Sequence, residues 1–281
     1  MGIRDAFNAM EREREEAQKR RQENAEKNSD LPEGVKRYIR NAEIGQGKPV
    51  VILDDPDEWF FYYAHIDTDF VPPRTFIKHV QPHTCLHSPK DVPSPDAYAD
   101  EFSRYRKPGK DVCPSCLAGI KRTLFFPIRL YDLDVKTWRV FDAKKYHAMN
   151  IIAAIDTMEK QGRKFNPNYT VIGEDVVIIK KTQDGKSFTL ETSDYVLTDE
   201  DRAKIAEIKK EKPNYAELVN MRNAEEVFKI AMEADDGHAD KEALRASKFA
   251  GHTGSAENAD APAEPKAGGG APSIGADDLP F

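Results

Sequence analysis

All three cysteines of the chain lie between residues 85 and 116, as Cys85 and the run Cys113-Pro114-Ser115-Cys116. A Cys-x-x-Cys motif places two thiolates on one turn, and a further Cys with a His from a neighbouring strand completes a tetrahedral zinc site. The motif predicts one structural Zn²⁺ per chain. The metal would hold the polar segment 86–112, which has few apolar side chains of its own. Histidines near enough in sequence to contribute are His65, His79, His83 and His87.

Two other interpretations of the cysteines stay open, namely a redox dithiol and inert thiols. A redox pair is expected at the start of a helix after a βαβ strand, whereas this pair ends a hydrophilic segment. A zinc deaminase needs His-x-Glu and Pro-Cys-x-x-Cys, but Asp67 stands in place of the Glu and Val112 in place of the Pro. The sequence also contains no phosphate-binding Gly-rich loop, no His-Glu-x-x-His and no Gly-x-Ser-x-Gly. We therefore expect no enzymatic activity.

A second group of residues combines cations with aromatic rings. The chain carries a net charge of −7, yet residues 117–165 contain ten basic and five acidic side chains. Rings stack on bases while cations follow phosphates, which is how single strands are bound without sequence reading. The alternative is an ordinary half-buried sheet with inward rings and solvated charges. The residues predicted to contact single-stranded DNA are Arg74, Phe76, Lys78, Lys121, Arg122, Arg129, Tyr131, Trp138, Arg139, Lys144 and Lys145.

The C-terminal end carries a third candidate site. Residues 235–276 are rich in Gly, Ala, Pro and Asp, so they bury too little apolar surface to order and are predicted to form a disordered acidic tether. The tip combines two carboxylates, one aromatic ring and the terminal carboxylate, which suit a pocket with an apolar base and a basic rim. The residues predicted to bind a protein partner are Asp277, Asp278, Leu279, Pro280 and Phe281.

The elements that must position these residues are mostly short strands. Apolar and aromatic runs predict strands near 36–40, 48–53, 59–65, 74–80, 123–133 and 137–142, with a hairpin over 176–192 around Asp184-Gly185. Helices are expected over 144–161, from Thr198, and within 213–234. We predict a mainly β fold with added helices (α+β), an OB-type Greek-key barrel with an inserted zinc lobe.

Composition divides the chain into four parts. Residues 1–31 form a charged N-terminal arm, 32–197 the OB-fold core with the zinc lobe at about 80–120, 198–234 the C-terminal helices, and 235–281 the acidic tail. No apolar run is long enough to cross a bilayer, and the N-terminus is densely charged where a signal peptide would be apolar. We therefore expect no membrane partner and no secretion.

Residues 35–192 resemble the phage single-stranded DNA-binding proteins of the T-even helix-destabilising type. The similar stretches include 36–40, 45–51, Ala64-His65, Thr84-Cys85 and 113–116. The terminal Leu-Pro-Phe is similar to the tail of bacterial single-stranded DNA-binding proteins. The resemblance implies an OB-fold with a zinc lobe, an N-terminal arm for cooperative self-association, and a tail that recruits replication and recombination proteins. It also implies a role in DNA replication, recombination and repair, in the cytoplasm of an infected bacterium.

By position, the resemblance implies the zinc ligands His65, Cys85, Cys113 and Cys116. The gap between His65 and Cys85 is longer than in that family, and the segment before Cys113 is expanded. His87 is therefore a rival fourth ligand. The competing function from another class is a zinc-containing adaptor that joins proteins and has no physiological affinity for DNA.

Overall fold

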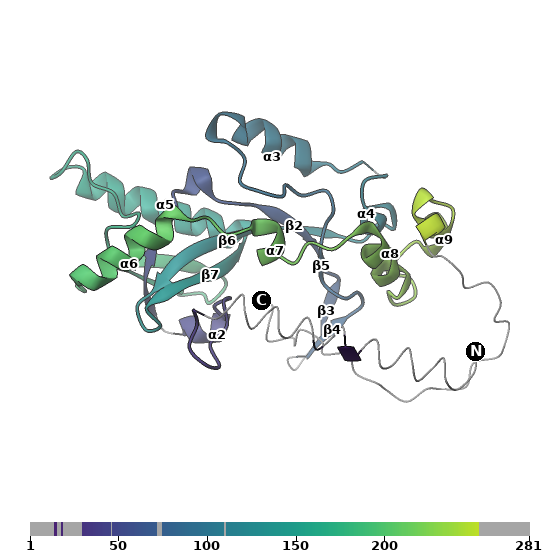
Figure 1. Ribbon diagram of the computed structural model, residues 1–281, viewed down its shortest axis with the longest axis horizontal. Helices are drawn as coiled ribbons and strands as arrows, with labels where there is room; N and C mark the ends of the chain where they lie inside the picture. The colour runs from purple at the N-terminus through teal and green to yellow at the C-terminus, as the bar shows by residue number, and fades with distance from the viewer. Residues whose placement is uncertain are drawn as a thin grey trace.

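The computed structural model describes residues 14, 15, 18, 30–45, 47–71, 75–109 and 111–252. Its centre is an antiparallel sheet (Figure 1) with strand order β5-β2-β6-β1-β8-β9, in which β7 pairs with the other edge of β6. The strands are β1 (Lys48–Ile52), β2 (Tyr62–His65), β5 (His83–Thr84), β6 (Arg122–Asp132), β7 (Thr137–Lys144), β8 (Val177–Lys181) and β9 (Phe188–Thr192).

Strand β6 organises the sheet because it pairs with three other strands. Its first residues pair with β2, its last residues with β1, and nearly its whole length with β7. The pairing path ends at β5 and β9, and neither strand pairs with β7 in the described part of the chain. The predicted closed Greek-key barrel is therefore not formed. The architecture is mixed α+β with an open antiparallel sheet.

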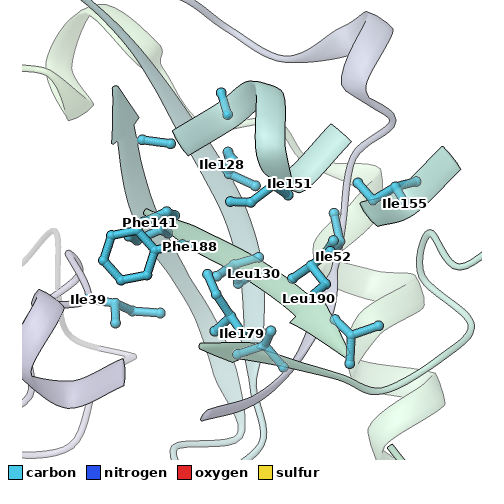
Figure 2. Close-up of a cluster of buried hydrophobic side chains, with 14 of the residues drawn as sticks. Ile39, Ile52, Ile128, Leu130, Phe141, Ile151, Ile155, Ile179, Phe188 and Leu190 are labelled. Atoms are coloured by element: carbon cyan, nitrogen blue, oxygen red, sulfur yellow. The ribbon is translucent and has the colours of Figure 1, made fainter. Parts of the chain in front are cut away.

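One face of the sheet packs against the long helix α5 (Lys145–Gly162). Side chains alternate between the faces of a strand, so Ile128 and Leu130 of β6 point towards this helix. They meet Ile151 and Ile155, which are buried as the apolar stripe of the helix predicts (Figure 2).

The opposite face is covered by α6 (Asp199–Lys210) and α7 (Tyr215–Leu218). Helix α6 begins where the sequence predicts, because the Thr198 side chain accepts a hydrogen bond from the Asp201 N–H. Tyr131 packs with Ile205, and Phe125 lies in the same cluster as Tyr215.

Three backbone carbonyls of this covering segment accept hydrogen bonds from side chains beneath it. Arg129 Nη1 donates to the carbonyl of Glu211 at 2.9 Å, Tyr38 Oη to that of Leu218 at 2.7 Å, and Thr84 Oγ1 to that of Val219 at 2.7 Å. The covering segment therefore supplies polar partners to the sheet as well as apolar contacts.

Segment 86–112, expected as a polar loop, contains a helix. Helix α3 (Tyr98–Arg106) places Tyr98, Phe102 and Tyr105 around the ring of Phe61. The three rings recur at helical spacing on a helix that is otherwise charged, so the segment has an apolar anchor of its own.

The smaller elements lie at one end of the sheet. A separate two-stranded ribbon consists of β3 (Thr68–Val71) and β4 (Thr75–Lys78). Helix α4 (Pro114–Leu117) packs on α8 (Ala224–Met232), which is followed by α9 (Lys241–Arg245). The predicted disordered tail was therefore started too early, because Leu244 and Phe249 are buried against α8. The remaining elements are α2 (Asn41–Ile44) and the 3₁₀ turns Pro56–Glu58, Pro95–Ala97 and Lys248–His252. Within the described ranges, no helix is both long and apolar enough to span a membrane.

Candidate metal centre

One cluster of side chains has the composition and spacing of a metal site. His65, Cys85, Cys113 and Cys116 each offer a ligand atom, and these four atoms all lie within 4.8 Å of one another. Cys113 Sγ and Cys116 Sγ are each 3.6 Å from His65 Nε2, and Cys85 Sγ is 3.5 Å from Cys116 Sγ. Zinc bonds of ordinary length place tetrahedral ligands about 3.6–3.8 Å apart. Three of the six separations are therefore close to those of a zinc tetrahedron, and all six are within 4.8 Å.

Three elements position the ligands. His65 ends β2, and Cys85 follows β5, whose backbone pairs with β2; the Cys85 N–H donates to the Tyr63 carbonyl at 2.7 Å. Cys113 is the N-cap of α4, so the short helix brings Cys116 back to the same side. His65 Nδ1 lies 3.0 Å from the Ile120 carbonyl. A proton on Nδ1 leaves the Nε2 lone pair free for a metal ion.

Burial makes a cation necessary for the ionised cluster. His65, Cys85 and Cys113 are fully buried. Hydrogen bonds from the Cys116 and Cys85 thiols hold the pKa of Cys113 far below its usual range. The hydrogen bonds to Cys113 also raise the pKa of Cys85 to about 12 and raise that of Cys116, so these two stay protonated when no cation is bound. All three can be thiolates only with a compensating positive charge. Because four protein ligands fill the tetrahedron, the site has the character of a structural centre, without an open position for substrate.

The other histidines of this region lie outside the ligand set. His87 Nε2 is 3.2 Å from the Arg104 carbonyl, and its ring packs on Tyr105. His83 stacks on the His65 ring and binds Ser115 Oγ through Nε2 at 2.7 Å; burial lowers the pKa of His83 to about 4. His83 therefore supports the centre as a neutral side chain, a role that only the pairing of β2 with β5 reveals.

The basic and aromatic face predicted on β6 and β7 is not presented to solvent. Arg129 is buried and binds both carboxylate oxygens of Asp54, through Nε at 2.6 Å and Nη2 at 2.9 Å. Arg139 is buried between Glu43 and Asp132, with Nη1 2.6 Å from the former and 3.0 Å from the latter.

The predicted aromatic contacts on these strands are also covered. Tyr131 is fully buried and donates its hydroxyl hydrogen bond to Asp201 at 2.8 Å. The guanidinium of Arg37 covers the half-buried Trp138 ring at 3.9 Å. These placements correct the predicted DNA contacts at Arg129, Arg139 and Tyr131, because each side chain is neutralised or covered inside the protein.

The remaining predicted contacts are distributed over several surfaces. Arg122 lies over the Tyr63 ring at 3.8 Å and donates to the carbonyls of His87 and Tyr105, so it fastens segment 86–112. Lys121 and Lys145 are exposed, Lys78 and Lys144 are half-buried, and Phe76 is exposed on β4. Arg74 and residues 277–281 lie outside the described residues.

The ribbon β3–β4 carries an aromatic surface; a strand was predicted for its second half, over 74–80, and none for β3. Phe70 pairs with Phe76 across the two strands, so both rings project from one face, with centroids 5.0 Å apart. They are 56% and 49% exposed. The base of the ribbon is fixed by His79, whose Nε2 lies 3.0 Å from Asp69 and whose Nδ1 lies 3.0 Å from Asp235.

Comparison with known proteins leaves the site to be interpreted from its own geometry. No family model matches the chain, and neither a curated protein nor a solved structure matches it.

Proposed function

We propose that this chain binds single-stranded DNA without catalysis, and that it coats DNA during phage replication, recombination and repair. The phage setting comes from the sequence resemblance. The tail would recruit replication and recombination proteins, and the N-terminal arm would support cooperative self-association on DNA. A Zn²⁺ ion would occupy the His65, Cys85, Cys113 and Cys116 centre as a structural element.

The observation that carries this proposal is the exposed ring pair Phe70 and Phe76. Exposed aromatic rings stack on bases of any sequence, at about 1–3 kcal/mol per base. The ribbon is inserted between His65 and Cys85: β3 begins shortly after His65, and β4 is followed by β5, which leads into Cys85. The metal would therefore hold the ribbon in a fixed orientation, which lowers the entropic cost of binding a flexible strand.

The test is a fluorescence anisotropy titration of the full chain with labelled oligo-dT at two salt concentrations, with a matched RNA in parallel. Binding that weakens as salt rises is expected, since phosphate contacts release counterions. The double variant Phe70→Ala/Phe76→Ala should bind at least about fivefold more weakly with an unchanged melting temperature. Absence of oligo-dT binding by the intact chain at low salt would end the proposal.

The tail is tested separately by deleting residues 277–281. Affinity for oligo-dT should stay equal or rise, since the deletion removes negative charge that competes with DNA. Capture of replication proteins by the immobilised chain should be lost.

The ribbon also supports a second candidate, the zinc-containing protein adaptor. Val71 and Ile77 are exposed, and the ribbon pairs with no other described strand. Unpaired strand edges bind extended peptides by β-augmentation. Tight protein binding through the ribbon, combined with no measurable affinity for oligonucleotides, would favour the adaptor.

A further inference from the structure

The loop that follows α5 holds an aromatic ring almost entirely in solvent. Phe165 is 91% exposed, more than any other large apolar side chain in the described part of the chain. It lies within the run Gly162-Arg163-Lys164-Phe165-Asn166. Removing such a ring from water on contact with a ligand is favourable.

Hydrogen bonds and packing make this loop rigid. The N–H groups of Phe165 and Asn166 donate to the Gly162 carbonyl at 2.9 and 3.0 Å, and the Tyr169 N–H donates to the Asn166 carbonyl at 2.9 Å. The Tyr169 ring lies directly against Gly162, where a Cβ atom would come within 2.0 Å of it. The outward position of Phe165 is therefore fixed by the loop itself.

Three cations lie close to Phe165 in the sequence and gather beside one another at the end of α5. Lys160, Arg163 and Lys164 line an open hollow together with Asp156 and Glu159. Lys160 and Lys164 are exposed, and neither forms an ion pair within the described ranges.

The Glu159 carboxylate is already committed to internal partners. It pairs with Arg163 and also accepts hydrogen bonds from Thr170 Oγ1 at 2.8 Å and from the Val171 N–H at 3.2 Å. Asp156, the other carboxylate of the hollow, forms no ion pair with Lys160 or Lys164 within the described ranges. The two lysines can therefore bind an anionic ligand.

We propose that this basic tip, defined as residues 160–168, is a second contact for single-stranded nucleic acid. Phe165 stacks on a base, while Lys160 and Lys164 contact the neighbouring phosphates. The inference rests on the proposed single-stranded DNA binding and adds a contact that the ribbon does not provide. Helix α5 lies well apart from β3 and β4 (Figure 1), so a strand that touches both would run over a large part of the protein surface.

The experiment measures oligo-dT affinity of the full chain for Phe165→Ala, Phe165→Leu and Phe165→Trp. Loss of a stacked base should weaken binding by about 5- to 150-fold in the Ala variant. The Leu variant should lose most of this affinity because Leu has no π face, and the Trp variant should retain it with quenched indole fluorescence. Tyr146→Ala is the matched control, since Tyr146 is an exposed ring on α5 itself.

The phosphate contacts have their own readout. Lys160→Ala/Lys164→Ala should reduce the slope of log K against log salt by about 1.4, given about 0.7 per phosphate contact on a single strand. Lys181→Ala/Lys186→Ala, which removes the same charge from the β8–β9 hairpin, should leave the slope close to that of the intact chain.

The outcomes separate this inference from the proposed function. If the intact chain binds oligo-dT and Phe165→Ala binds equally well, the tip is not a contact although DNA binding stands. Equal losses in Phe165→Ala and Tyr146→Ala would also overturn the inference. The inference would also be overturned if the Phe165→Ala variant bound oligo-dT normally but no longer bound anionic lipid vesicles. That result would assign the basic tip to a lipid surface. If the intact chain binds no oligonucleotide, the proposed function itself fails.

Discussion

His79 is held between two carboxylates in a way that fixes its charge. Both ring nitrogens face carboxylate oxygens at 3.0 Å, from Asp235 and Asp69, and a neutral imidazole has only one N–H to donate. The ring also stacks on His238, which binds Asp67. These contacts raise the pKa of His79, chiefly through the bond with Asp235 and then the bond with Asp69.

The ribbon should therefore loosen as pH rises. A histidine whose pKa is raised in the folded state contributes stability below about pH 6.5, and this contribution is lost as pH rises through the raised pKa. Amides of residues 68–78 should show lower hydrogen-exchange protection at pH 8.5 than at pH 6, after correction for intrinsic rates. His79→Gln should remove this pH dependence, whereas equal protection at both pH values in the intact chain would contradict the prediction.

Asp142 is a buried carboxyl group with one oxygen unsatisfied. Tyr62 donates to Oδ2, but Oδ1 has no hydrogen-bond partner among the residues that the structure describes. Burial raises the pKa of Asp142 to about 7, above its value of 3.8 in an unfolded chain. The folded protein then binds the extra proton, so stability falls as pH rises from about 4 to about 7.

Replacing Asp142 with Asn should raise the free energy of unfolding at pH 8 by about 1–3 kcal/mol, since a buried charge that lacks a partner is removed. The dependence of stability on pH between about 4 and 7 should flatten as well. Urea denaturation at both ends of this range measures the effect. Asp194→Asn, at an exposed position, is the control; a less stable Asp142→Asn protein at pH 8 would refute the assignment.

At the scale of elements, β6 depends on buried ion pairs to seat α6 and α7. Arg129→Ala should lower the free energy of unfolding by about 3–5 kcal/mol because it leaves Asp54 buried and unpaired. Arg129→Met/Asp54→Leu should recover much of this loss. Any loss of DNA affinity in the Arg129→Ala variant should be explained by the fraction of the protein that is unfolded. A loss of DNA affinity in Lys121→Ala, a change at an exposed residue, should occur without unfolding. If the Arg129→Ala protein were fully stable but bound DNA weakly, the original prediction that Arg129 contacts DNA would stand.

Local sequence patterns were sufficient for elements whose signals are contained in a few residues. Examples are the stripe of α5, the start of α6 at Thr198, and the Asp184-Gly185 turn, where Gly185 has a φ of 67°. Alternation showed that Arg129 and Tyr131 share a face but could not show what covers it. Their partners Asp54 and Asp201 lie 75 and 70 residues away in sequence.

The metal centre shows the same division between local and distant information. The cysteine spacing indicated three ligands. The resemblance implied His65 as the fourth ligand and left His87 as a rival. The β2–β5 register, in which His65 pairs with His83, places His65 in the cluster. Strand pairing over such a separation is not encoded in any short motif, which is also why the open sheet was predicted as a closed barrel.

At the scale of the whole molecule, the metal centre joins the sheet to the C-terminal helices, since α4 packs on α8. We expect one zinc ion per chain by elemental analysis. Cys113→Ser should lose the metal, lower the melting temperature and expose segment 86–112 to proteolysis. A chelator should lower the melting temperature of the intact chain in the same way. His87→Ala is the control, and loss of metal in that variant would contradict the ligand assignment.

The carbonyls of Glu211, Leu218 and Val219 limit how far the chain can be shortened. A fragment that ends at about residue 197 would keep every strand of the central sheet. In that fragment, however, Arg129, Tyr38 and Thr84 would each lose a buried hydrogen-bond acceptor. Orphaned donors of this kind are costly. The smallest autonomous folding unit therefore extends past residue 219, and a fragment that ends before this residue should be degraded by protease under conditions in which the intact chain is not.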